Sequence, residues 1–93
     1  MPYVQMQQNY PNPFNPNTNI NFYIPVDDNI SLSIYNVRGQ KIKILYLGFI
    51  ESGSHTLSWD GRDDFSRYVS SGIYFYKLTT SHGNLIKRMI LIK

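Results

Sequence analysis

The chain has 93 residues, which allows one domain with a thin core, because folding at this size buries only about 60–65% of the surface of the unfolded chain. A deep catalytic cleft is hard to fit into such a domain. Hydrophobic residues make up 42% and aromatic residues 15% of the chain, a composition that favours strands over helices. Because Cys is absent, a disulfide framework and a thiolate metal site are both excluded.

The formal net charge is +3, but the nine Lys and Arg residues are scattered and never form a basic block. Nucleic-acid binding is therefore not favoured, since it needs clustered cations beside stacking aromatic rings. The charges are expected to solvate strand faces and to discourage pairing between sheet edges. No apolar run approaches the roughly 20 residues that span a bilayer, and the start of the chain lacks the regions of a signal peptide. An export signal would therefore belong to a longer parent chain.

The first 16 residues contain the run Tyr10-Pro11-Asn12-Pro13-Phe14-Asn15-Pro16. Each proline fixes its own φ angle and pushes the residue before it away from the helical region. We expect residues 1–16 to form a stiff, Pro- and Asn-rich joint between a preceding domain and the first strand. Residues 17–93 are then expected to form the folded domain.

Apolar and polar residues alternate through the middle of the chain, as in half-buried strands. The alternation predicts strands over residues 20–24, 30–34 and 41–44, with turns between them, and the last two form a hairpin around Gly39. We expect a short connection between Leu47-Gly48 and Ser52-Gly53. A further strand follows, with His55, Leu57 and Trp59 on one face.

The polar residues Asp60–Ser71 are expected to form a long loop that crosses between two sheets. The runs 73–80 and 85–92 are separated by Ser81-His82-Gly83-Asn84 and predict a second antiparallel hairpin. No segment has a helical period over a useful length. The chain is therefore predicted to be all-β, an immunoglobulin-like antiparallel β-sandwich of about seven strands.

Several short motifs occur along the chain in a fixed order. They are Tyr10-Pro11-Asn12-Pro13-Phe14-Asn15-Pro16, Ile34-Tyr35-Asn36-Val37-Arg38-Gly39-Gln40, Gly53-Ser54-His55, Trp59-Asp60-Gly61, Ser71-Gly72-Ile73-Tyr74-Phe75-Tyr76 and Lys87-Arg88-Met89. Over nearly the whole chain, this set resembles the C-terminal sorting domains of the type IX secretion system. The pattern is also similar to the immunoglobulin-like domain of flagellar hook-capping proteins. Ser66 departs from the sorting family, which usually has Gly at this place in the crossover loop.

The resemblance implies a non-catalytic domain that takes its parent protein through the periplasm and across the outer membrane, to the cell surface or the medium. The implied partners are the type IX translocon, the surface-attachment machinery and the preceding domain of the parent; no cofactor, nucleic acid or small-molecule substrate is implied. We expect recognition through the last hairpin, by strand addition or docking. The candidates for recognition are Gly72, Tyr74, Lys87, Arg88 and Lys93. The motif residues expected to act structurally are Pro11, Asn12, Pro13, Gly39, Trp59, Asp60 and Gly61.

Some of these residues allow other interpretations. We expect the Trp59 side chain to fill the core; the alternative is an exposed side chain whose ring stacks on sugars. The carboxylates of Asp60, Asp63 and Asp64 would suit Ca²⁺, but their spacing is not that of a known calcium loop. His55 and His82 each follow a Ser, but the sequence has no nucleophile turn and no oxyanion hole.

Two functions from other classes are the alternatives to sorting. The domain would be an accessory module that spaces a secreted hydrolase or binds glycan through exposed Tyr, or it would be a subunit-assembly domain like that of the hook-capping protein.

Overall fold

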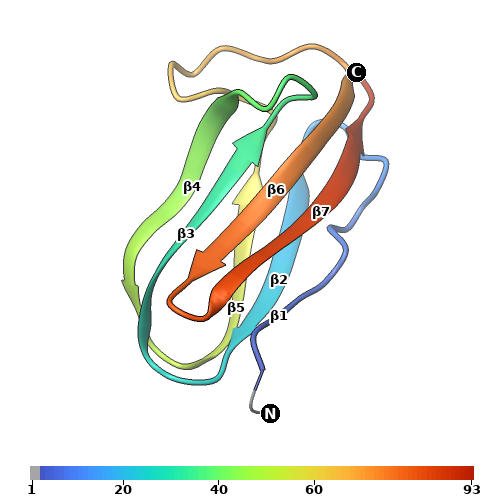
Figure 1. The fold of residues 1–93 in the computed structure, drawn as a ribbon. Helices are drawn as coiled ribbons and strands as arrows, with labels where there is room; N and C mark the ends of the chain where they lie inside the picture. Colours follow the sequence, from blue (N-terminus) through green and yellow to red (C-terminus); the bar gives the residue numbers. More distant parts are fainter. Residues whose placement is uncertain (1–2) are drawn as a thin grey trace.

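The computed structural model describes residues 3–93, which form seven strands and no helix (Figure 1). In this part of the chain there is accordingly no helix long and apolar enough to cross a membrane. The strands are β1 (Gln5–Met6), β2 (Thr18–Ile24), β3 (Asp28–Tyr35), β4 (Lys41–Ile50), β5 (Gly53–Trp59), β6 (Gly72–Thr80) and β7 (Gly83–Leu91).

The strands form two antiparallel sheets that face each other. The smaller sheet has the order β1-β2-β5 and the larger sheet has the order β4-β3-β6-β7 (Figure 1). The loop Asp60–Ser71 leaves β5 in the smaller sheet and enters β6 in the larger one, as predicted. The predicted all-β immunoglobulin-like sandwich is confirmed.

The core lies between the sheets and consists of the apolar residues that alternate along each strand. Both predicted hairpins, β3–β4 and β6–β7, are present and antiparallel. The buried hydrophobic side chains of the strands are Met6, Ile20, Phe22, Ile24, Ile30, Leu32, Ile34, Ile50, Trp59, Tyr74, Tyr76, Leu78, Met89 and Leu91. The period of two that predicted the strands therefore also identifies most of the core.

Strand β4 is longer than the sequence predicted. It runs to Ile50 and includes Leu47-Gly48, so the predicted connection to the next strand is shorter than expected and consists of Glu51 and Ser52. Gly48 instead pairs with Ile30 in the ladder to β3, and the register shifts between Leu32 and Ser33. Gly48 thus lies in a regular stretch of the ladder, although a glycine flanked by apolar residues suggested a turn in the sequence.

The structure differs from the expected division of the chain at residue 16. Gln5 and Met6 pair with β2, and Phe14 is 2% exposed within the core. Residues of the Pro- and Asn-rich segment therefore belong to the packed sandwich. Their apolar side chains and backbone hydrogen bonds hold the segment against the sheets.

A buried polar network fastens this segment to the larger sheet. The Asn9 N–H donates to the Tyr76 hydroxyl at 2.9 Å, and this hydroxyl donates to the Gln7 carbonyl at 2.9 Å. The Asn9 side chain donates to Thr18 Oγ1 at 2.9 Å. Burial raises the pKa of the Tyr76 phenol, so the group stays neutral and keeps both bonds.

Replacing Tyr76 by Phe is expected to lower the free energy of unfolding by about 1–3 kcal/mol, because it leaves the Asn9 N–H and the Gln7 carbonyl without this partner. Urea denaturation measures the change. Tyr10→Phe is the control, since Tyr10 is 78% exposed and its loss is expected to stay within about 0.5 kcal/mol. Equal stability of the two variants would show that the network contributes nothing.

The crossover loop contains a residue in the left-handed region. Ser66 has φ = 63°, the one positive value outside glycine among residues 3–93, and it stands where the sorting family usually has Gly. The loop turns here because Asp63 Oδ1 accepts the N–H groups of Phe65 at 2.9 Å and Arg67 at 3.0 Å. These bonds, Arg67 first, lower the pKa of the Asp63 carboxyl.

Ser66→Gly is expected to stabilise the domain by about 0.5–1 kcal/mol. A serine at this positive φ pays a steric cost that glycine avoids, and this cost exceeds the additional conformational entropy that glycine loses on folding. The measurement is the midpoint of urea unfolding. Ser52→Gly is the matched control in another exposed turn, where the φ angle is negative. That change is expected to destabilise, and the same sign for both variants would contradict the argument.

Candidate recognition site around the last strand

Three aromatic rings from separate motifs meet beside the end of β7. The ring of Trp59 lies 5.7 Å from that of Phe14 and 5.5 Å from that of Tyr74, the latter edge to face. Trp59 is 1% exposed and its Nε1 donates to the Arg62 carbonyl at 2.8 Å. Such offset and edge-on pairs stabilise a core beyond the area that they bury. This aromatic cluster of Phe14, Trp59 and Tyr74 fixes one end of the sandwich.

Gly61 lets the chain pass close to the aromatic cluster. It is buried with φ = 78°, and a Cβ atom on it would lie 3.5 Å from the Pro16 carbonyl oxygen and 3.8 Å from Leu91 Cδ2. These are ordinary van der Waals distances, so the φ angle, which residues with a side chain rarely adopt, is what favours glycine here. The motif Trp59-Asp60-Gly61 thus meets the Pro- and Asn-rich segment and the last strand at one place.

The Pro- and Asn-rich segment also covers the outer edge of β7. Phe14 N–H donates to the Ile90 carbonyl at 3.0 Å, and Ile92 N–H donates to the Phe14 carbonyl at 2.9 Å. Asn12 Oδ1 accepts the Ile90 N–H at 3.0 Å, and Gln8 Nε2 donates to the Arg88 carbonyl at 2.6 Å. Strand addition between Arg88 and Ile92 would therefore have to displace this segment first.

The crossover loop covers the opposite edge of the larger sheet. Asp64 N–H donates to the Ile42 carbonyl at 3.0 Å, and Asp64 Oδ1 accepts the Ile44 N–H at 3.2 Å. Lys43 Nζ lies 3.8 Å from the same carboxylate oxygen. Both edges of this sheet are thus protected by non-strand segments near the aromatic cluster.

Three of the five recognition candidates lie at this end of the molecule. Gly72 begins β6 with φ = 153° and pairs with Leu91. Tyr74 is 6% exposed, and its hydroxyl donates to the Ser70 carbonyl at 2.6 Å, so it is a core residue. Lys93 N–H donates to Ser71 Oγ at 3.0 Å, and its Nζ lies 5.6 Å from the Tyr68 ring.

The other two candidates lie farther along β7 and point to different faces. Lys87 shares the inward face with Met89 and Leu91 and is half-buried. An inward charge on an edge strand discourages pairing with another chain. Arg88 is exposed on the outer face, where it lies opposite Phe75. The five candidates therefore do not form one surface.

The remaining structural candidates lie in turns and loops. Gly39 closes the turn after β3, where Asn36 Oδ1 accepts two backbone N–H groups. The Pro11 carbonyl accepts from Asn9 and from Thr18, while Asn12 is bound to β7 and Pro13 is exposed. Asp60 Oδ1 accepts the Arg62 N–H at 3.1 Å.

The carboxylates that would have suited Ca²⁺ do not converge. Asp60 caps the turn at Arg62, Asp63 caps the crossover turn and Asp64 binds β4. Nowhere in residues 3–93 do three carboxylate, His or Cys side chains gather in a way that would hold a metal ion.

Ser81 and His82 form part of a turn together with Asp28. Asp28 Oδ2 accepts from Ser81 Oγ at 2.9 Å and from its N–H at 3.1 Å, and these bonds lower the pKa of the Asp28 carboxyl. A catalytic triad places the imidazole between the hydroxyl and the carboxylate. Here the hydroxyl binds the carboxylate directly, so the contacts tie the β6–β7 turn to β3.

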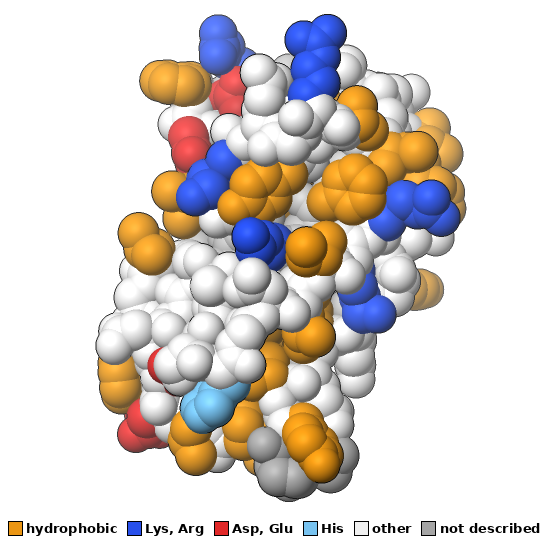
Figure 2. All heavy atoms as spheres, in the orientation of Figure 1, with side chains coloured by type: hydrophobic (Ala, Val, Ile, Leu, Met, Phe, Trp, Pro, Cys, Tyr) orange, Lys and Arg blue, Asp and Glu red, His pale blue; other side chains and the backbone are white. Residues whose placement is uncertain are grey.

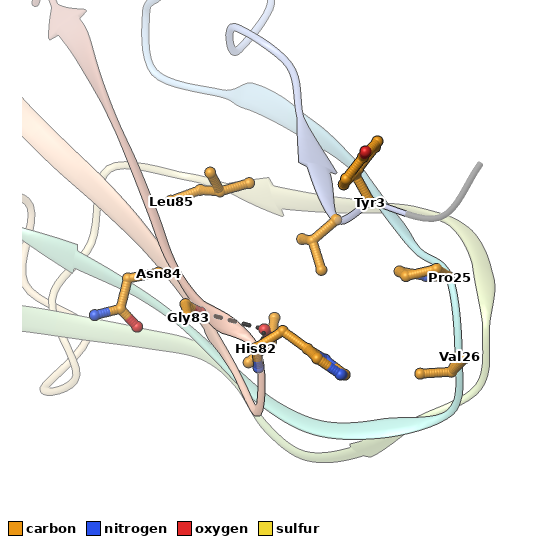
Figure 3. A pocket seen from close by; sticks show the side chains of 9 residues that line it. Tyr3, Pro25, Val26, His82, Gly83, Asn84 and Leu85 are labelled. Atoms are coloured by element: carbon orange, nitrogen blue, oxygen red, sulfur yellow. Dashed lines mark hydrogen bonds between the residues drawn. The ribbon is translucent and has the colours of Figure 1, made fainter.

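A groove of about 580 Å³ lies beside the β6–β7 turn (Figure 3), at the other end of β7 from the aromatic cluster. Tyr3, Pro25, Val26, His82 and Leu85 line it, together with neighbouring residues of β7. This groove contains none of the recognition candidates.

Sequence reasoning missed several residues that hold the site together. Asn9 and Thr18 are buried polar residues, and Phe14 is a core residue within a segment expected to be a joint. The available signal was the single large apolar residue flanked by Asn-Pro on both sides, which is unusual in a solvated linker.

Two solved structures from Porphyromonas gingivalis share the fold. Dimeric latent PorU gives a TM-score of 0.75 at 18% identity, over 99% of this chain and 10% of that chain. PorZ, described as an essential bacterial surface component of the type-IX secretion system, gives 0.60 at 23% identity, over 97% of this chain and 11% of that chain. At this identity the likeness shows the fold alone.

A flagellar protein is related in sequence. The basal-body rod modification protein FlgD of Salmonella typhimurium is 30% identical over 56 residues, which are 60% of this chain and 24% of that protein. The chain thus spans less than two thirds of the relative that it matches. The resemblance to flagellar proteins indicated by the sequence motifs is confirmed.

A family model matches most of the chain. The description "Secretion system C-terminal sorting domain" applies to residues 8–93, which include every motif that carried the resemblance to type IX sorting domains. The chain therefore belongs to the secretion system C-terminal sorting domain family.

Proposed function

We propose that this domain directs a larger parent protein through the periplasm and across the outer membrane by the type IX secretion machinery, and that the machinery recognises the domain in its folded state. The parent is then attached to the cell surface or released. The domain is non-catalytic in this role and needs no cofactor. Membership of the sorting family supports the proposal.

The observation that carries the proposal is the attachment of the last strand to the family motifs. Phe14 forms two backbone hydrogen bonds with the end of β7, and its ring packs on Trp59. Gly61 lies against Leu91 from the other side. A component of the machinery that binds the last strand would therefore distinguish a folded domain from an unfolded one, because the strand is fixed in place only when the motifs have packed together.

A reporter fusion tests the proposal in a bacterium that has a type IX system. Deleting Leu91 to Lys93 removes a core side chain and the bonds made by the Ile92 and Lys93 amides. We expect the truncated fusion to remain in the periplasm, as measured by fractionation, whereas the full fusion reaches the surface or the medium.

The control is Lys93→Gln, which keeps the chain length and the backbone bond to Ser71. This fusion is expected to be exported. Unchanged export of the truncated fusion would refute recognition of the folded last strand.

A further inference from the structure

Recognition of the larger sheet must use its outer face near the aromatic cluster, because both edges are covered there. Residues 8–14 bind the edge of β7, and Asp64 binds the edge of β4. A partner that approaches this part of the sheet meets side chains of the outer face before it meets free backbone groups.

The outer face of β6 and β7 carries apolar side chains where an exposed sheet usually carries polar ones. Ile86 is 59% exposed and Ile73 is 40% exposed, and Ile73 lies opposite Ile90. Figure 2 shows this face toward the viewer, with hydrophobic side chains interspersed with Lys and Arg. A solvated face alone does not account for so many apolar residues on one side of a small domain.

A groove of about 460 Å³ lies within this face. Tyr35 and Phe75 are cross-strand partners on β3 and β6, and they line the groove with Lys77 and Ile86. The turn residues Val37 and Gly39 close one end. The floor of the groove is thus apolar, and it is formed mainly by β3 and β6, the two central strands of the larger sheet.

Cations surround the groove. Lys77 Nζ and Lys41 Nζ lie 5.9 Å and 6.0 Å from the Tyr35 ring, and Arg88 lies opposite Phe75 on β7. The six acidic residues of the chain lie in turns and loops, apart from Asp28 at the first position of β3, which is bound to Ser81. The groove is therefore electrostatically complementary to an anionic partner.

We propose that this groove, with Tyr35, Phe75, Lys77, Ile86 and Arg88, docks an acidic protein segment that carries aliphatic or aromatic side chains between its carboxylates. The carboxylates pair with the cations at the rim, and the apolar side chains cover Phe75 and Ile86. A second copy of this chain does not fit, because a symmetric contact would place Lys77 and Arg88 against cations. That the segment belongs to the export machinery rests on the proposed function.

The purified domain tests the binding directly with a short, fluorescein-labelled synthetic peptide in which Glu alternates with Leu and Trp. Fluorescence anisotropy gives the affinity, and amide chemical shifts locate the contact. Replacing Lys77 and Arg88 by Gln together is expected to weaken binding about tenfold or more. The control replaces Arg67 and Lys93 by Gln, which changes the net charge equally outside the groove. Its affinity is expected to stay within about twofold.

Several outcomes would overturn the proposal. Equal weakening in both double variants would show that net charge alone binds the peptide, and shifts confined to other strands would place the contact elsewhere. Phosphatidylglycerol vesicles give a further outcome. If they displace the peptide at a comparable or lower molar concentration, and if their binding requires Lys77 and Arg88, the groove binds a lipid headgroup instead.

Export of the same variants separates this inference from the proposed function. A fusion with Lys77→Gln and Arg88→Gln is expected to be exported less than the control variant. Normal export of that fusion, with peptide binding lost, would overturn the role of the groove while the sorting function stands. Failure of the unmodified fusion to leave the periplasm would refute the sorting function, whatever the peptide result.

Discussion

Replacing Phe14 by Ala is expected to lower the free energy of unfolding by about 3–5 kcal/mol, the usual cost of removing a large buried ring. Phe14 is 2% exposed and packs against Trp59, so the truncation leaves a cavity beside the aromatic cluster. The loss is a large share of the about 5–15 kcal/mol that holds a typical domain folded. Urea denaturation followed by the fluorescence of Trp59, the one Trp of the chain, measures it.

The same substitution has a local readout at the last strand. The Ile92 amide donates to the Phe14 carbonyl, so a loosened segment exposes this amide to solvent. Hydrogen exchange at Ile92 is expected to rise more than exchange in the central ladder between β3 and β6, because the backbone bonds of Phe14 go to Ile90 and Ile92.

Phe65→Ala is the matched control, since Phe65 is 78% exposed on the crossover loop. Its effect is expected to stay within about 0.5 kcal/mol. A loss below about 1 kcal/mol for Phe14→Ala would mean that the Pro- and Asn-rich segment is not part of the core.

The strands and their faces were predictable because the side-chain period of a strand is local information. Ile20, Phe22 and Ile24 alternate with polar residues, and this alternation predicts both the strand and its buried side. The hairpin turns were predictable for the same reason, since Asn and Gly residues mark them within a few positions.

The position of Phe14 was not predictable, because its surroundings are set by contacts distant in sequence. Its carbonyl and N–H bind the end of the chain at Ile92 and Ile90, and although the Asn-Pro pairs around Phe14 hint that it is buried, no pattern within residues 10–16 identifies these partners. Gly48 misled the prediction in the opposite way. Glycine marks turns locally, but pairing with Ile30 of β3 holds Gly48 inside a strand.

The recognition candidates were chosen from motifs, which do not reveal exposure. Tyr74 and Arg88 come from neighbouring strands of one hairpin, but one is in the core and the other is on the outer face. The groove at Tyr35 was missed because it needs the pairing of β3 with β6, across the crossover loop.

Replacing Leu91 by Ala is expected to cost about 2–5 kcal/mol in the free energy of unfolding, whereas Ile92→Ala is expected to cost about 0.5 kcal/mol or less. Leu91 is 1% exposed and lies against Gly61, while the next residue, Ile92, is 51% exposed. Both variants keep the chain length, and the backbone bond of Ile92 to Phe14 does not involve either side chain. Urea denaturation of the two variants measures the difference.

The two variants also test whether export depends on the folded state of the domain or on individual side chains at the end of β7. If the machinery recognises a folded domain, the Leu91→Ala fusion loses export in proportion to its unfolded fraction, and the Ile92→Ala fusion is exported normally. A lower temperature that restores folding of Leu91→Ala is then expected to restore its export, as fractionation of the reporter would show. Loss of export in Ile92→Ala with unchanged stability would contradict this, because it would assign recognition to the exposed side chain of Ile92, which lies outside the groove, instead of to the folded domain.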